Sequence, residues 1–82
     1  MYKLRISSRA RKEIKKISRE HQKAILSALQ EIREDPLSGK PLGRNLEGRL
    51  TFRVGVYRII YIIRAKDKIV EILTAGHRAK VY

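Results

Sequence analysis

The chain has 82 residues, of which 43% are hydrophobic and 34% are charged. This length predicts one domain, residues 1–82, with a small core, and the composition excludes collagen-like, low-complexity and wholly disordered proteins. Lys and Arg number 20 against 8 Asp and Glu, giving a net charge of +12 that is spread along the chain. Such an excess favours anionic partners, with nucleic acid first, an acidic protein second and a membrane surface third.

The chain contains no Cys, which excludes disulfides, Cys-based zinc sites and thiol nucleophiles. The longest apolar run, residues 59–63, is far shorter than the ~20 residues of a membrane span. The N-terminus has no signal-peptide core, so we expect a cytoplasmic protein that does not bind membranes. His21 and His77 lie far apart and have no metal-binding spacing, and we expect neither a metal nor a cofactor.

The first half of the chain predicts a strand followed by two helices. Residues 2–6 alternate between apolar and polar, which is typical of a half-buried strand. Ser7 and Ser8 are suitable helix N-caps, and an amphipathic helix is expected over residues 8–18. A second apolar stripe predicts a helix over residues 20–34 that ends before Asp35-Pro36. The two helices should form an antiparallel hairpin that turns near residues 18–20.

The second half predicts a loop and three strands. Residues 36–48 contain both prolines and are expected to form a loop. Apolar and β-branched residues predict strands over residues 50–54, 56–64 and 69–75, with a turn at Gly55 and an end at Gly76. The predicted fold class is therefore α+β, in the order β-α-α-β-β-β, with an antiparallel sheet and the helical hairpin packed on one of its faces.

Basic and aromatic residues that could carry chemistry are concentrated in the last third of the chain. Arg58 is the most informative of them, because an arginine within an apolar strand costs energy unless it reaches water or an anion. Tyr61 lies in the same strand, and we expect it in the core. The sequence contains neither a phosphate-binding loop nor a dinucleotide-binding fingerprint.

These residues also carry a resemblance to a known family. The segments LEG (46–48), FRVGVYRIIY (52–61) and AGHR (75–78), followed by Val81 and Tyr82, resemble the RelE/ParE superfamily of type II toxin–antitoxin toxins, on the RelE-like side. The resemblance extends over essentially the whole chain, because the first strand, the two helices and the loop also fit. It implies a RelE-like fold.

The resemblance further implies a function and a set of partners. RelE-like toxins are ribosome-dependent mRNA endoribonucleases, or mRNA interferases, which inhibit translation without a metal and use the 2′-hydroxyl of the RNA. It implies a cognate acidic, RelB-like antitoxin, and a toxin–antitoxin complex that can bind operator DNA. It also implies catalytic roles for Arg53, Arg58, Arg78 and Tyr82.

The proposed roles agree with the chemistry of RNA cleavage. Guanidinium groups grip phosphate with paired hydrogen bonds, so Arg53, Arg58 and Arg78 are expected to bind and stabilise it. Arginine is a poor base, so Tyr82 would orient or deprotonate the nucleophile, and His77 is a reserve acid or base. The further residues expected to contact RNA are Lys40, Arg44, Arg49 and Lys80.

Three alternatives remain open. The first is a ParE-like inhibitor of DNA gyrase that lacks nuclease activity. The second is a degenerate toxin, since Thr51 stands where RelE-type sites often carry a basic residue. The third is a basic nucleic-acid-binding module without chemistry, whose affinity would fall steeply with salt.

Overall fold

The computed structural model describes residues 2–41 and 48–77. These residues form, in chain order, β1 (Lys3–Ile6), α1 (Ser8–Lys15), α2 (Arg19–Glu34), the 3-10 turn η1 (Pro36–Ser38), β2 (Lys40–Pro41), β3 (Arg49–Val54), β4 (Tyr57–Arg64) and β5 (Ile69–His77). The predicted α+β class and the order of the main elements are confirmed.

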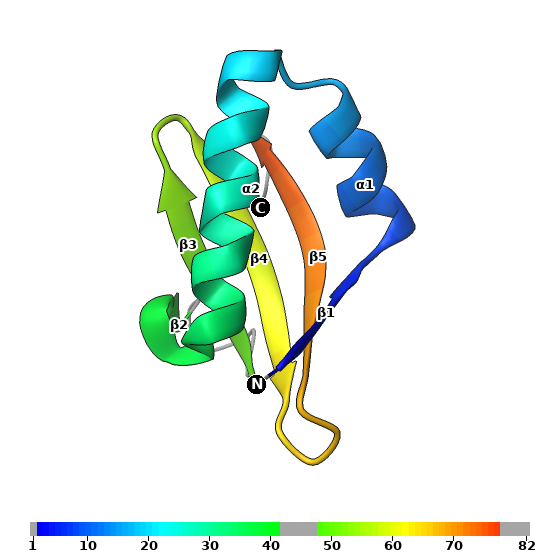
Figure 1. Ribbon diagram of the computed structural model, residues 1–82, viewed down its shortest axis with the longest axis vertical. Coiled ribbons are helices and arrows are strands. Elements are labelled where there is room, and N and C mark those ends of the chain that lie inside the picture. Colours follow the sequence, from blue (N-terminus) through cyan, green and yellow to red (C-terminus); the bar gives the residue numbers. More distant parts are fainter. Residues whose placement is uncertain (1, 42–47, 78–82) are drawn as a thin grey trace.

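The strands form one twisted sheet in the order β1-β5-β4-β3-β2 (Figure 1). The pairs β2–β3, β3–β4 and β4–β5 are antiparallel. The edge strand β1 lies parallel to β5. The hairpin between β3 and β4 turns over two residues, and the first of them, Gly55, has a φ of 58°. Glycine adopts this left-handed conformation without strain, which explains its place in the turn.

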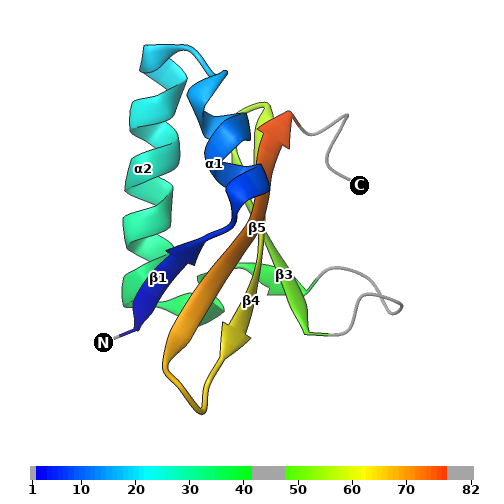
Figure 2. The same ribbon diagram turned by 90° about the vertical axis from the view of Figure 1, so that its right-hand side faces the viewer.

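Both helices cover the same face of the sheet (Figure 2). The Ser7 hydroxyl caps α1 by accepting a hydrogen bond of 3.0 Å from the backbone N–H of Ala10, as the sequence predicts. The buried core lies between helices and sheet and consists of Ala10, Ile17, Ile25, Ala28, Leu29, Ile32, Ile59, Tyr61, Val70, Ile72 and Ala75. Tyr61 is thus in the core, as expected.

The opposite side of the sheet carries no helix of the described chain, and we call it the open face. By strand alternation its residues include Lys40 of β2; Arg49, Thr51 and Arg53 of β3; Arg58, Ile60, Ile62 and Arg64 of β4; and Glu71, Leu73 and Gly76 of β5. Neither described helix has the length and apolar character needed to cross a membrane.

The structure corrects three predicted boundaries. The first helix ends at Lys15 rather than near Ser18, because its last turn tightens into i→i+3 hydrogen bonds at Lys16 and Ile17. β5 continues through Gly76 to His77, because the first two residues of β4, Tyr57 and Arg58, pair with them there. The expected loop over 36–48 contains the turn η1 and the short strand β2, which pairs with β3.

Candidate functional site

Two of the predicted arginines lie side by side on the open face. Arg53 of β3 and Arg58 of β4 are directly opposite each other in the antiparallel register, and Gly76 of β5 is the partner of Arg58 on its other side. Directly opposed residues have Cβ atoms about 4.5–5.5 Å apart, which is within the span of two guanidinium groups that hold one phosphate. Residues from three strands therefore form one row across the sheet.

Arg58 is the more buried member of this pair. Only 5% of its surface is exposed, whereas Arg53 is exposed to solvent. A buried guanidinium has lost much of its hydration, so its attraction to an anion is stronger than that of a solvated surface cation. The pair thus combines a largely buried arginine with an exposed one.

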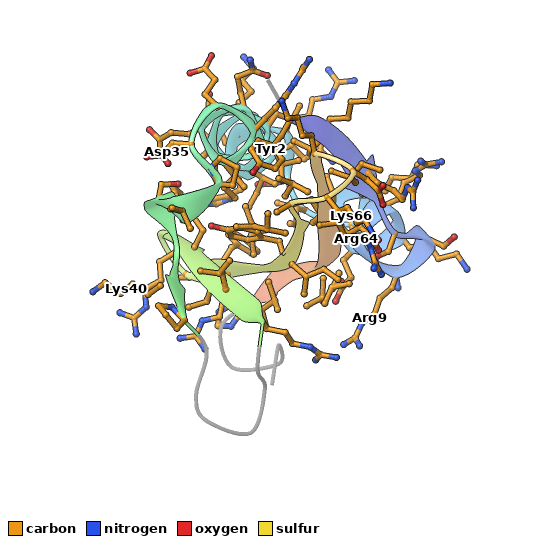
Figure 3. The ribbon with its side chains drawn as sticks, turned by 90° about the horizontal axis from the view of Figure 1, so that it is seen from below. Tyr2, Arg9, Asp35, Lys40, Arg64 and Lys66 are labelled. Carbon is orange, nitrogen blue, oxygen red and sulfur yellow. The ribbon has the colours of Figure 1, made fainter. Side chains whose placement is uncertain are left out.

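Further basic residues extend the open face on the side of β2 and β3. Arg49, Thr51 and Arg53 are alternate residues of β3, so their side chains lie on the same face of the sheet. Lys40 of β2 is the direct partner of Thr51 and shares its face. Figure 3 shows Lys40 pointing away from the body of the molecule, on the opposite side from Arg64 and Lys66. Lys40, Arg49, Arg53 and Arg58 thus all lie on the open face.

His77 is on the other side of the sheet from the arginine pair. It is the register partner of Tyr57, and its ring lies edge-on to the Tyr57 ring with centroids 6.1 Å apart. Tyr57 packs on the core between sheet and helices, and it also contacts the His21 ring at 5.2 Å. This placement does not bring the His77 imidazole beside Arg53 and Arg58.

Four residues that the sequence predicts to act at the site lie outside the described residues. They are Arg44, Arg78, Lys80 and Tyr82. Arg78 directly follows His77, the last residue of β5. In sequence it is two residues after Gly76, which pairs with Arg58. The roles predicted for these four residues remain predictions.

A second group of arginines at the far end of the open face is neutralised within the chain. Glu71 of β5 forms an ion pair with Arg5 of β1, with Nη1 and Oε1 3.8 Å apart, and a second ion pair with Arg64 of β4. The hydrogen bond and charge of Glu71 raise the pKa of the Arg64 guanidinium. Arg5 and Arg64 therefore already have an anionic partner within the chain.

A carboxylate that the sequence analysis overlooked secures the end of β5 that leads into the site. Glu13 of α1 accepts hydrogen bonds from the Thr74 hydroxyl and, at 3.1 Å, from the backbone N–H of Ala75. These contacts occupy the edge of β5 beyond the point where β1 ends. A signal was present in the sequence, since Glu13 is the single acidic residue of an otherwise basic helix.

A buried hydroxyl, also overlooked, holds the segment that carries Lys40. The Tyr61 hydroxyl donates to the Pro36 carbonyl at 2.7 Å and accepts from the Gly39 N–H at 3.0 Å. Burial raises the pKa of the Tyr61 phenol above its ordinary value of 10.0, although the hydrogen bond from Gly39 opposes this shift. The phenol is therefore neutral at physiological pH and can make both bonds.

Comparison with known proteins shows the family of the chain. Residues 4–82 match the family model described as the ParE toxin of the type II toxin–antitoxin system parDE. The chain is 35% identical to the toxin RelG of Mycobacterium tuberculosis over 83 aligned residues, which cover 99% of this chain and 95% of RelG.

Solved structures share the architecture. The toxin–antitoxin complex RelBE2 of Mycobacterium tuberculosis contains a chain with a TM-score of 0.86 and 33% identity, covering 94% of this chain and 98% of that one. A chain of the intact E. coli RelBE complex has a TM-score of 0.82 at 22% identity, covering 94% and 96%. The second likeness concerns the fold alone.

The family match and the fold shared with a solved relative place the chain among the toxins of type II toxin–antitoxin systems. The chain belongs to the RelE/ParE superfamily of these toxins.

Proposed function

We propose that the protein is a ribosome-dependent mRNA endoribonuclease that inhibits translation in the cytoplasm. The observation that supports this most directly is the pairing of Arg53 with Arg58 on the open face. Two neighbouring guanidinium groups attract an anion strongly, because together they can direct several charged hydrogen bonds at its oxygens. An RNA phosphodiester has the charge and the oxygen geometry to occupy that position.

In the proposed reaction the RNA supplies its own nucleophile. The 2′-hydroxyl attacks the adjacent phosphorus, the P–O5′ bond breaks, and the products are a 2′,3′-cyclic phosphate and a 5′-hydroxyl. Arg58 would hold the non-bridging oxygens while charge develops on them, and Arg53 would supply a second set of donors from the solvent-exposed side. The proton leaves the 2′-hydroxyl and another is delivered to the 5′-oxygen, so the reaction consumes no net proton.

The proton transfers are assigned to the end of the chain. Arginine remains protonated and is a poor base, so Tyr82 is proposed to orient or deprotonate the 2′-hydroxyl, with Arg78 as a third phosphate ligand. His77 is a weaker candidate than the sequence suggests, because its ring packs against Tyr57 on the helix side of the sheet. The ribosome would contribute by holding the message in the in-line geometry that cleavage requires.

The remaining open-face cations would bind the RNA on either side of the cleaved bond. Lys40 and Arg49 lie on the β2–β3 side of the row, and Arg44 and Lys80 are proposed to add to this surface. Such contacts make binding strongly salt-dependent without specifying the sequence.

We also propose that a RelB-like antitoxin controls the protein. Solved relatives come from toxin–antitoxin complexes, and a net charge of +12 favours association with an acidic partner. The antitoxin would be an acidic, partly disordered chain that folds on binding, and the complex would bind operator DNA.

The decisive test compares messages and DNA topology in the same cells. After induced expression, primer extension should detect new 5′ ends within translated messages, while plasmid supercoiling stays normal. Purified protein should cleave a message on programmed ribosomes and leave the same message intact when it is free. Intact messages after growth arrest would contradict the nuclease proposal.

A second candidate is favoured by one observation. The family model that matches the chain is named for the ParE toxin, so a ParE-like inhibitor of DNA gyrase is the alternative. It predicts intact messages together with inhibited supercoiling. A degenerate toxin predicts neither effect, and harmless high-level expression without an antitoxin would support it.

A further inference from the structure

We infer that Tyr61 is a positioning residue for RNA binding, acting through the backbone of residues 36–41 on Lys40. This inference rests on the proposed nuclease function. Tyr61 itself is fully buried between the sheet and the helices, on the face opposite to the arginine pair, so it does not touch RNA. Its effect is transmitted by hydrogen bonds to a segment that does reach the open face.

The hydroxyl of Tyr61 binds both ends of a short stretch of backbone. It donates to the carbonyl of Pro36 at 2.7 Å, at the start of η1, and accepts from the N–H of Gly39 at 3.0 Å, at its end. One side chain therefore fixes where the turn begins and where the following strand starts. Since the oxygen is both a donor and an acceptor, phenylalanine would lose both bonds at once.

The backbone at Gly39 is also in close van der Waals contact with the Tyr61 side chain. A Cβ atom added at Gly39 would lie 2.4 Å from the Tyr61 hydroxyl oxygen and 2.8 Å from the Thr51 carbonyl oxygen. Gly39 has a φ of −81°, an ordinary value, so the glycine is required by close approach and not by backbone conformation. The hydroxyl thus sets the distance between this segment and the sheet.

The next residue along the chain is a proposed RNA contact. Lys40 forms β2 together with Pro41 and is the register partner of Thr51, between Arg49 and Arg53 on β3. β2 has two residues and pairs with β3 alone, so little else in the strand determines its position. The two Tyr61 hydrogen bonds hold the backbone that leads into this short edge strand, and so set the position from which the Lys40 side chain extends.

A double-mutant cycle separates positioning from general stabilisation. Tyr61→Phe, Lys40→Ala and the double variant are compared with wild type on programmed ribosomes, measuring kcat and KM for message cleavage together with thermal unfolding. We expect Tyr61→Phe to raise KM about threefold to tenfold and leave kcat unchanged. In the Lys40→Ala background the same substitution should add no further change in KM, because the group that it positions is gone.

The matched control is Tyr2→Phe. Tyr2 also packs on the core, and its hydroxyl has no hydrogen-bond partner within residues 2–41 and 48–77. This variant should retain the wild-type KM. Gly39→Ala tests the same contact from its other side, and it should raise KM in the same way as Tyr61→Phe even where Tyr61→Phe fails to fold.

The outcomes distinguish the inference from the proposed function. A wild-type protein that cleaves no message overturns the nuclease proposal and, with it, the role of Tyr61 in RNA binding. A wild-type protein that cleaves while Tyr61→Phe and Gly39→Ala match its KM overturns the inference alone. The inference would also be overturned if the double variant raised KM by the product of the two single increases. That result would show that Tyr61 does not act through Lys40.

Discussion

Arg53 and Arg58 face each other as directly opposed residues of two antiparallel strands, and both carry a permanent positive charge. Directly opposed like charges destabilise a sheet, whereas opposed unlike charges stabilise it. The register therefore places two like charges next to each other on the basic face. An anion bound between them would offset their mutual repulsion, which leads to the next two predictions.

Replacing the exposed partner should stabilise the free protein. Arg53→Ala removes the repulsion on Arg58, and we expect the free energy of unfolding to rise by about 0.2–1 kcal/mol at low salt. The gain should shrink as salt is added, because screening already weakens the repulsion. Urea unfolding at two salt concentrations measures both effects. Lys66→Ala, in the turn between β4 and β5, is the control and should not show this salt-dependent gain.

Replacing the buried partner should abolish toxicity. Arg58→Ala is expected to lower message cleavage about 100-fold or more, since it removes a preorganised donor to the developing charge. Arg58→Lys keeps the charge but loses the paired hydrogen bonds, so it should recover part of the activity. Cleavage on programmed ribosomes and growth after induction are the two measurements. Arg64→Ala is the matched control, on the same strand and face, and full toxicity of Arg58→Ala would refute the assignment.

Glu13 should contribute to stability through the end of β5. Glu13→Ala removes the acceptor for the Ala75 N–H and the Thr74 hydroxyl, and we expect a loss of about 1–3 kcal/mol in the free energy of unfolding. Glu13→Gln retains one acceptor oxygen and should lose less. Chemical denaturation gives the values. Glu34→Ala, at the exposed end of α2, should change little, and an equal loss in both variants would argue against a specific role.

The raised pKa of Tyr61 predicts a loss of stability in alkaline solution. Because burial favours the neutral phenol in the folded state, the unfolded chain releases this proton first, near pH 10.0. The stability that depends on the neutral form is therefore complete below that pH and falls as the pH rises towards the higher pKa of the folded state. Urea unfolding from pH 9 to pH 11 should fall more steeply for wild type than for Tyr61→Phe. Parallel curves would contradict this reading.

The elements of the fold were predictable because their signals are local. Alternation over residues 2–6, the apolar stripes of the helices and the Asp35-Pro36 stop each lie within one segment, and the structure confirms them with small shifts of the ends. The errors arose where a distant partner decides the outcome. Gly76 reads as a strand breaker, but its pairing with Arg58 keeps it in β5. Residues 40–41 read as loop, but β3 and the Tyr61 hydroxyl hold them as a strand.

The same division holds for the candidate site. By itself, the sequence determined that the protein is basic, that Arg58 interrupts an apolar strand, and that its segments resemble RelE/ParE toxins, because these properties depend on composition and short-range order. Only the tertiary structure decided that Arg53 stands opposite Arg58, that β1 joins β5 in parallel, and that the His77 ring packs on the helix side with Tyr57. Strand register is the physical reason, since a shift of one residue moves every side chain to the other face.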